Sequence, residues 1–100
     1  MKAAARIGDN VYTGHLCSII VPLLVPSQSG VFINGVLAAT VFAELEPHSI
    51  LSSGSCVPHT GTVISGSTKV TFGGLAAARI GDPADLGNII TGSPNVFIGG

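Results

Sequence analysis

Three histidines and two cysteines are the side chains of this 100-residue chain that could hold a transition metal, namely His15, Cys17, His48, Cys56 and His59. Cys56 and His59 form a Cys-x-x-His pair, a spacing that lets two side chains converge on one ion. His48 lies eight residues before Cys56, and His15 lies far upstream, as expected where a loop is pinned to a distant strand. Thiolate combined with imidazole favours Zn²⁺ over Mg²⁺ or Ca²⁺. The residue types therefore predict a zinc site.

The number of donors indicates a structural site rather than a catalytic one. Four protein ligands close a zinc site, whereas three ligands plus water make a catalytic one. The chain can supply four, and it has no H-E-x-x-H, G-x-S-x-G or G-x-x-x-x-G-K motif. We predict that the protein is not an enzyme, with a small zinc hydrolase as the weaker alternative. A second alternative has the histidines as surface residues and the cysteines as small buried hydrophobes.

The redox state of the two cysteines decides whether they are available as ligands. They close one disulfide if the chain is oxidised. The amino terminus has no classical export signal, because Arg6 and Asp9 interrupt it before an apolar region can form. Reduced thiols or metal ligation are therefore the expectation, since disulfides are rare in reducing compartments.

Residues 48–59 carry two of the histidines in a segment rich in serine, glycine and proline, which we interpret as a loop. Little else in the segment would order it. Zinc binding contributes roughly 10–16 kcal/mol in small folds, which equals or exceeds the ~5–15 kcal/mol net stability of a typical domain. One ion would therefore decide whether this loop is folded.

The elements that must position these donors come from an internal repeat. Three segments read as a turn, a short β-rich run and a closing glycine, at residues 27–35, 66–74 and 92–100. Asn34-Gly35 and Gly73-Gly74 predict two-residue hairpin turns, because both central residues of such a turn need positive φ. Three related units also predict pseudo-threefold symmetry.

A second repeated element is the heptapeptide AAARIGD, which occurs at residues 3–9 and 76–82. An altered copy at residues 38–43 has lost the arginine, the glycine and the aspartate. A helix is not expected, because the alanine run is one turn long and glycine follows it. We expect the alanines to pack between strands and each arginine to pair with its aspartate across a turn.

Composition limits the fold class and the partners. Apolar residues make up 46% of the chain and charged residues 9%, which indicates an ordered core. Four Lys or Arg stand against five Asp or Glu, so there is no basic stripe for nucleic acid. Leu16–Val25 is broken by Ser18 and Pro22 and is shorter than the roughly 20 residues that span a bilayer. Fourteen glycines, six prolines and short β-rich runs predict one small all-β domain over residues 1–100.

Taken in order, these motifs resemble a known family. AAARIGD, TGH at 13–15, VFING at 31–35, CVPH at 56–59 and GSPNVFIGG at the end are similar to a PAAR-repeat protein over essentially the whole chain. The resemblance implies a small pointed β cone, pinned near its apex by a structural zinc ion on three histidines and a cysteine. It assigns those roles to His15, His48, Cys56 and His59, with Cys17 as the alternate ligand and iron as the alternative metal.

The resemblance also implies a function. Such cones cap and sharpen the trimeric β-helical spike of contractile injection machines, either type VI secretion systems or phage tails, and help to pierce the target envelope. The implied partner is a VgrG-like or phage central spike, one chain per trimer, with transient contact with the target membrane and separate effector proteins as further partners. The chain would be cytoplasmic before firing and outside the cell afterwards, or at the tail tip of a virion. We expect no fused effector extension; a metal-independent adaptor that recruits effectors is the alternative.

Besides the altered middle repeat, two features depart from the family pattern. Leu86 occupies a position where relatives often carry a cysteine, and Leu16–Val25 is more apolar than the segment usually found there. For Ile19, Ile20, Leu23 and Leu24 the alternatives are the core, a docking base or an exposed apolar patch, and we expect the core.

Overall fold

The computed structural model describes residues 1–100 and is all-β. Its strands are short, as the turn-rich sequence predicts, and no helix in it is long and apolar enough to span a bilayer. The thirteen strands are β1 (Lys2–Ala3), β2 (Asn10–Tyr12), β3 (Ile20–Val25), β4 (Phe32–Ile33), β5 (Val36–Leu37), β6 (Glu44–Leu45), β7 (His48–Ser52), β8 (Ser55–His59), β9 (Thr71–Phe72), β10 (Leu75–Ala76), β11 (Pro83–Ala84), β12 (Gly87–Ile89) and β13 (Phe97–Ile98).

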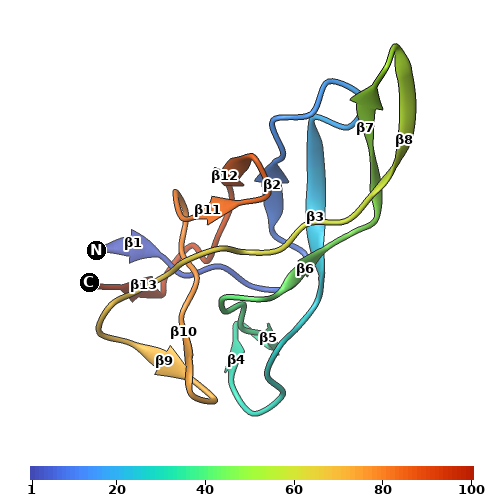
Figure 1. Ribbon diagram of the computed structural model, residues 1–100. Coiled ribbons are helices and arrows are strands. Elements are labelled where there is room, and N and C mark those ends of the chain that lie inside the picture. Colours follow the sequence, from blue (N-terminus) through green and yellow to red (C-terminus); the bar gives the residue numbers. More distant parts are fainter.

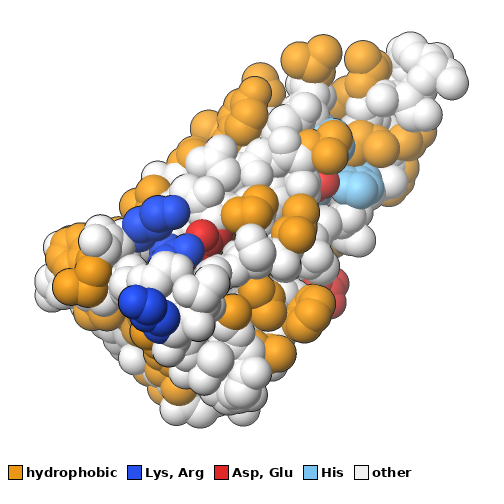
Figure 2. Space-filling model, turned by 60° about the vertical axis from the view of Figure 1, so that its left-hand side comes forward, with side chains coloured by type: hydrophobic (Ala, Val, Ile, Leu, Met, Phe, Trp, Pro, Cys, Tyr) orange, Lys and Arg blue, Asp and Glu red, His pale blue; other side chains and the backbone are white.

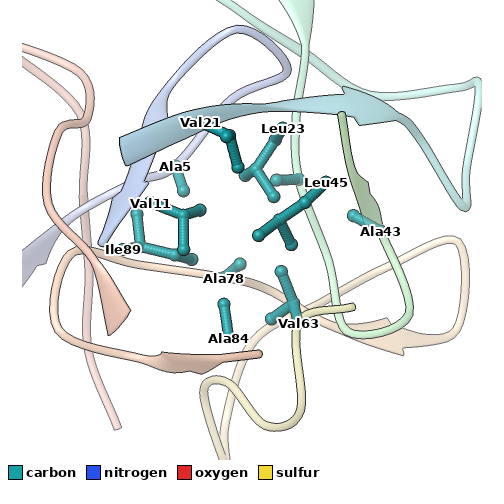
Figure 3. Close-up of a cluster of buried hydrophobic side chains, with 11 residues drawn as sticks. Ala5, Val11, Val21, Leu23, Ala43, Leu45, Val63, Ala78, Ala84 and Ile89 are labelled. Atoms are coloured by element: carbon teal, nitrogen blue, oxygen red, sulfur yellow. The ribbon is translucent and has the colours of Figure 1, made fainter. Parts of the chain in front are cut away.

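The middle of the molecule is a closed ring of strands around the larger of two apolar clusters. Five strands pair in the order β11-β12-β2-β3-β6. Residues 62–63 close the ring, because Thr62 bridges Glu44 of β6 and Val63 bridges Ala84 of β11. The side chains that point inward form a cluster of 11 residues (Figure 3), namely Ala5, Val11, Val21, Leu23, Ala39, Ala43, Leu45, Val63, Ala78, Ala84 and Ile89.

The three alanine-rich segments form a second, tighter ring of hydrogen bonds. The N–H of Ala5 donates to the carbonyl of Ala78, that of Ala78 to Ala39, and that of Ala39 to Ala5, with N–O distances of 2.9, 3.0 and 3.0 Å. All three residues are fully buried. A larger side chain would have no room where three backbones converge. The prediction that these alanines pack between strands is confirmed, and the pseudo-threefold symmetry is a property of the fold.

The predicted hairpin turns are confirmed at both positions. Asn34 and Gly35, with φ of 55° and 81°, join β4 to β5, and Gly73 and Gly74, with φ of 61° and 82°, join β9 to β10. In the third repeat, the equivalent pair consists of β13 and β1, which are the last and the first strand of the chain. Figure 1 shows both termini beside this pair, at the end of the molecule that we call the base, which comprises the pairs β4–β5, β9–β10 and β13–β1.

The two arginine–aspartate pairs tie down their turns as predicted. In both copies the aspartate carboxylate accepts from the backbone N–H and the guanidinium of the arginine three residues earlier, Arg6 for Asp9 and Arg79 for Asp82. Hydrogen bonds from Arg79 to Asp82, and the carboxylate charge, raise the pKa of the guanidinium although burial opposes this.

The molecule is elongated, with extents of 41 × 23 × 21 Å. The hairpin β7–β8 forms the end opposite the base (Figure 1), and we call that end the tip. Figure 2 shows the elongated shape of the molecule. Residues 48–59 are therefore a paired hairpin rather than the loop that the serine-rich composition suggested. Five residue pairs join the two strands, and Ser53 and Gly54 take the positive φ that its turn requires.

The apolar segment at residues 16–25 divides between core and surface. Leu23 is fully buried, whereas Ile19, Ile20 and Leu24 are each about half exposed. The expectation that all four belong to the core is wrong for three of them. Leu23 points into the ring and Leu24, its neighbour in β3, points out, because side chains alternate along a strand.

Phe42 offers a test of the threefold equivalence. Its φ of 71° lies in the left-handed region, like the 99° of Gly8 and 91° of Gly81, the glycines at the same position of the other copies. Phe42 is 62% exposed, so little burial depends on it. Left-handed backbone costs a non-glycine residue roughly 1 kcal/mol. We expect Phe42→Gly to be about 1 kcal/mol more stable than Phe42→Ala in urea unfolding, since both lack the ring and only the alanine keeps a Cβ. Equal stability of the two variants would contradict the strain.

Candidate metal centre

The connections between paired strands meet at one end of the ring, on the side of the tip. β2 is joined to β3 by residues 13–19, β6 to residues 62–63 by the hairpin β7–β8, and β11 to β12 by Asp85-Leu86. These are equivalent positions of the three repeats. Because the repeats surround one axis, side chains from all three connections can approach one another there.

Three histidines converge on a single carboxylate at this point. The Nε2 atoms of His15 and His59 lie 3.0 and 3.2 Å from Oδ1 of Asp85, and Nε2 of His48 lies 2.7 Å from Oδ2. Ring centroids are 5.0 to 5.6 Å apart, and one donor atom from each of the four residues lies within 4.8 Å of the others. His15, His48 and His59 are thus brought together as the sequence suggested, with Asp85 as an added member.

The site is shielded from water most strongly at its centre. The side chains of Asp85 and His48 are 6% and 2% exposed, whereas that of His59 is 30% exposed. Burial alone would raise the pKa of Asp85, but the hydrogen bonds from His15, His59 and His48 and the charge of His15 outweigh it and hold the pKa below its ordinary value. Asp85 is therefore ionised and accepts hydrogen bonds from the imidazoles.

Local backbone geometry aims these side chains. Asp85 adopts a φ of 53° in the tight turn between β11 and β12, a conformation that aspartate tolerates better than most residues. His48 and His59 are direct partners across the hairpin. The Nδ1 atom of His48 lies 2.8 Å from the carbonyl oxygen of Glu46. That bond fixes the ring and leaves Nε2 free to face Asp85.

The four residues have the features of a transition-metal site. Imidazole nitrogens and a carboxylate oxygen are ligands for Zn²⁺ and for Fe²⁺. A backbone carbonyl on the second nitrogen of a ligating histidine, as Glu46 provides for His48, is the usual support of such a ligand. His15, His48, His59 and Asp85 fit a metal ion, and they would hold it as a closed, four-ligand site.

The cysteines are not part of this cluster. Cys17 and Cys56 form a disulfide, which corrects the expectation of reduced thiols and removes both sulfur atoms as thiolate ligands. Strand geometry gives the reason for Cys56. In an extended strand, residues three apart point to opposite faces and lie roughly 10 Å apart, so the Cys-x-x-His spacing separates Cys56 from His59 within β8. Cys17 lies in the connection 13–19, outside any strand.

The sequence analysis does not identify Asp85, because the residues next to it in the sequence do not mark it as a ligand. The signal that could have found it is the repeat itself. The turn after the third heptapeptide is equivalent to the segment that carries His15 after the first one, so a polar residue there reaches the same point on the axis.

Comparison with known protein families gives one match, the PAAR motif, over residues 53–100. This range contains His59 and Asp85 and the third copy of the repeat. No curated protein matches the chain.

Gly61 allows the position of Asp85 to be tested without altering a donor. A Cβ on Gly61 would lie 2.7 Å from Cγ of Asp85, which is closer than atoms can approach, so Gly61→Ala must displace the carboxylate. We expect this variant to lose about 1–3 kcal/mol of stability and to shift the histidine ring resonances in NMR spectra. Gly30→Ala is the matched control, because a Cβ there meets no atom within 4 Å. Equal melting temperatures for the two variants would contradict the packing of Asp85 against Gly61.

Proposed function

Because this chain is a PAAR-repeat protein, we propose that it caps the trimeric β-helical spike of a contractile injection machine and forms its piercing point. The PAAR motif supports a spike-tip role. The observation that carries the proposal for this chain is the base, where three equivalent strand pairs surround a pseudo-threefold axis. A body with a three-part base and a narrow far end suits the end of a trimer, one chain per trimer.

The base has the surface that such docking needs. Phe32 and Phe97 occupy equivalent positions of β4 and β13, and their side chains are 60% and 53% exposed. Exposed apolar side chains on short strands can cover the apolar end of a trimeric spike, while strand edges of the two proteins pair through their backbones. The implied partner is a VgrG-like spike or the central spike of a phage.

The metal in this proposal is a structural Zn²⁺ at His15, His48, His59 and Asp85, with Fe²⁺ as the alternative. When bound, the ion would join the three connections at the tip and stiffen it against force. Among the protein's own residues, Asp85 supplies the negative charge, and the carbonyl of Glu46 orients His48. The hairpin β7–β8 sets the spacing of His48 and His59. Nothing in this role requires turnover, in keeping with a structural spike-tip family.

The setting of the machine is part of the proposal. In a type VI secretion system the chain would be cytoplasmic before firing and would then be delivered outside the cell with the spike, in transient contact with the target membrane. In a phage it would lie at the tail tip of the virion. Effector proteins would bind as separate chains.

Substitutions at the base and at the tip distinguish a specific loss of spike binding from a general loss of folding. We expect Phe32→Glu combined with Phe97→Glu to abolish co-purification with a trimeric spike from the same genome, because carboxylates would be buried in the apolar contact. Leu51→Glu is the control, since Leu51 is 51% exposed at the tip, and it should leave one chain bound per trimer. Loss of binding only in the Leu51 variant would refute docking through the base.

The metal makes a separate prediction. Elemental analysis of the purified protein should give one zinc or iron per chain, and chelation should lower the melting temperature because binding energy contributes to folding. A His48→Ala variant should contain no metal and should not respond to chelator. Spike binding without any metal in the native protein would instead favour the metal-independent adaptor.

A further inference from the structure

The disulfide joins the two segments that bring histidines to Asp85. Cys17 lies two residues after His15 in the connection 13–19, and Cys56 lies three residues before His59 in β8. The bond spans 39 residues of sequence. It therefore links the two segments directly beside the candidate metal centre.

Few other contacts hold these two segments together. Apart from the cluster itself, one hydrogen bond joins them, from the N–H of Ser49 to Oγ of Ser18 at 3.0 Å. Leu16, between His15 and Cys17, is 78% exposed, so the connection has little apolar burial at that point. In the reduced chain, the link between the connection that carries His15 and the hairpin that carries His48 and His59 would depend on this one hydrogen bond and on their shared contacts with Asp85.

A preformed site binds its ligand more tightly than one that must be ordered during binding. A crosslink across a long loop removes part of that ordering cost beforehand. Here the crosslink holds His15 close to the hairpin that carries His48 and His59, before any ion is present. It does so without competing for the ion, because both sulfur atoms are bonded to each other.

We propose that the Cys17–Cys56 disulfide is a redox-sensitive clamp on a three-nitrogen, one-oxygen metal centre, so that oxidation of the two thiols raises its affinity for a divalent transition metal. This rests on the proposed metal role of the His15, His48, His59 and Asp85 cluster. In the oxidation step each thiol loses one proton and one electron and the S–S bond forms. The electron acceptor is an external disulfide of the glutathione class, which is reduced to two thiols.

The test titrates Co²⁺ into the metal-free full chain, once oxidised and once reduced with a phosphine, and repeats both titrations on Cys17→Ser/Cys56→Ser. The Co²⁺ spectrum reports both affinity and donor type. We expect the oxidised chain to bind at least about tenfold more tightly than the reduced chain and the serine variant, with no thiolate-to-cobalt band in the oxidised form. Asp85→Asn should weaken binding in both redox states, which identifies the oxygen ligand.

Three results would overturn the proposal. Equal affinity in all three forms, with unchanged circular dichroism, would show that the disulfide does not support the site. Tighter binding by the reduced chain together with a thiolate band would make a cysteine the ligand. Absence of Co²⁺ binding in every form would refute the metal role as well, whereas spike capping is scored independently by co-purification. If the serine variant fails to fold, the reduced native chain gives the same comparison.

Discussion

Three alanine backbones that hydrogen-bond to one another around a common axis determine the rest of this structure. The last alanine of each copy, Ala5, Ala39 or Ala78, donates to one neighbour and accepts from the other, so the ring closes only when all three segments meet. The residues two positions later form a second cyclic set that runs in the opposite direction around the axis, from Ile7 to Leu37, Val41 to Ala76 and Ile80 to Ala3. Alanine is required because the backbones approach too closely for a larger buried side chain.

Along the long axis of the molecule, the base is regular and the tip side is not. The base repeats one strand pair three times, whereas the connections on the tip side differ in length: a two-residue turn, a seven-residue segment and a full hairpin. The cyclic hydrogen bonds fix where these connections begin and end, so their side chains can vary while still meeting at the axis. The regular end is the one that we propose as the docking surface, and the irregular end carries the histidines and the carboxylate.

Local rules in the sequence account for most of the fold and for part of the site. Asn34-Gly35 and Gly73-Gly74 predict their hairpins because the need for positive φ is a property of the turn itself. The histidines were found by residue type. Cys56 was assigned to the wrong partner, because whether a Cys-x-x-His pair converges depends on the backbone being a turn or a strand. Asp85 reaches the site only through the threefold arrangement, which no local pattern encodes.

The pair formed by β13 and β1 has a topological consequence. Every other repeat closes this pair with a two-residue turn, and here the chain termini occupy that place. The order of the three units around the axis is therefore cyclic. A permuted chain, with Gly100 linked to Met1 and opened between Asn34 and Gly35, would keep the same order of units around the axis. The fold is defined by the order of the three units around the axis, and not by which unit comes first in the chain.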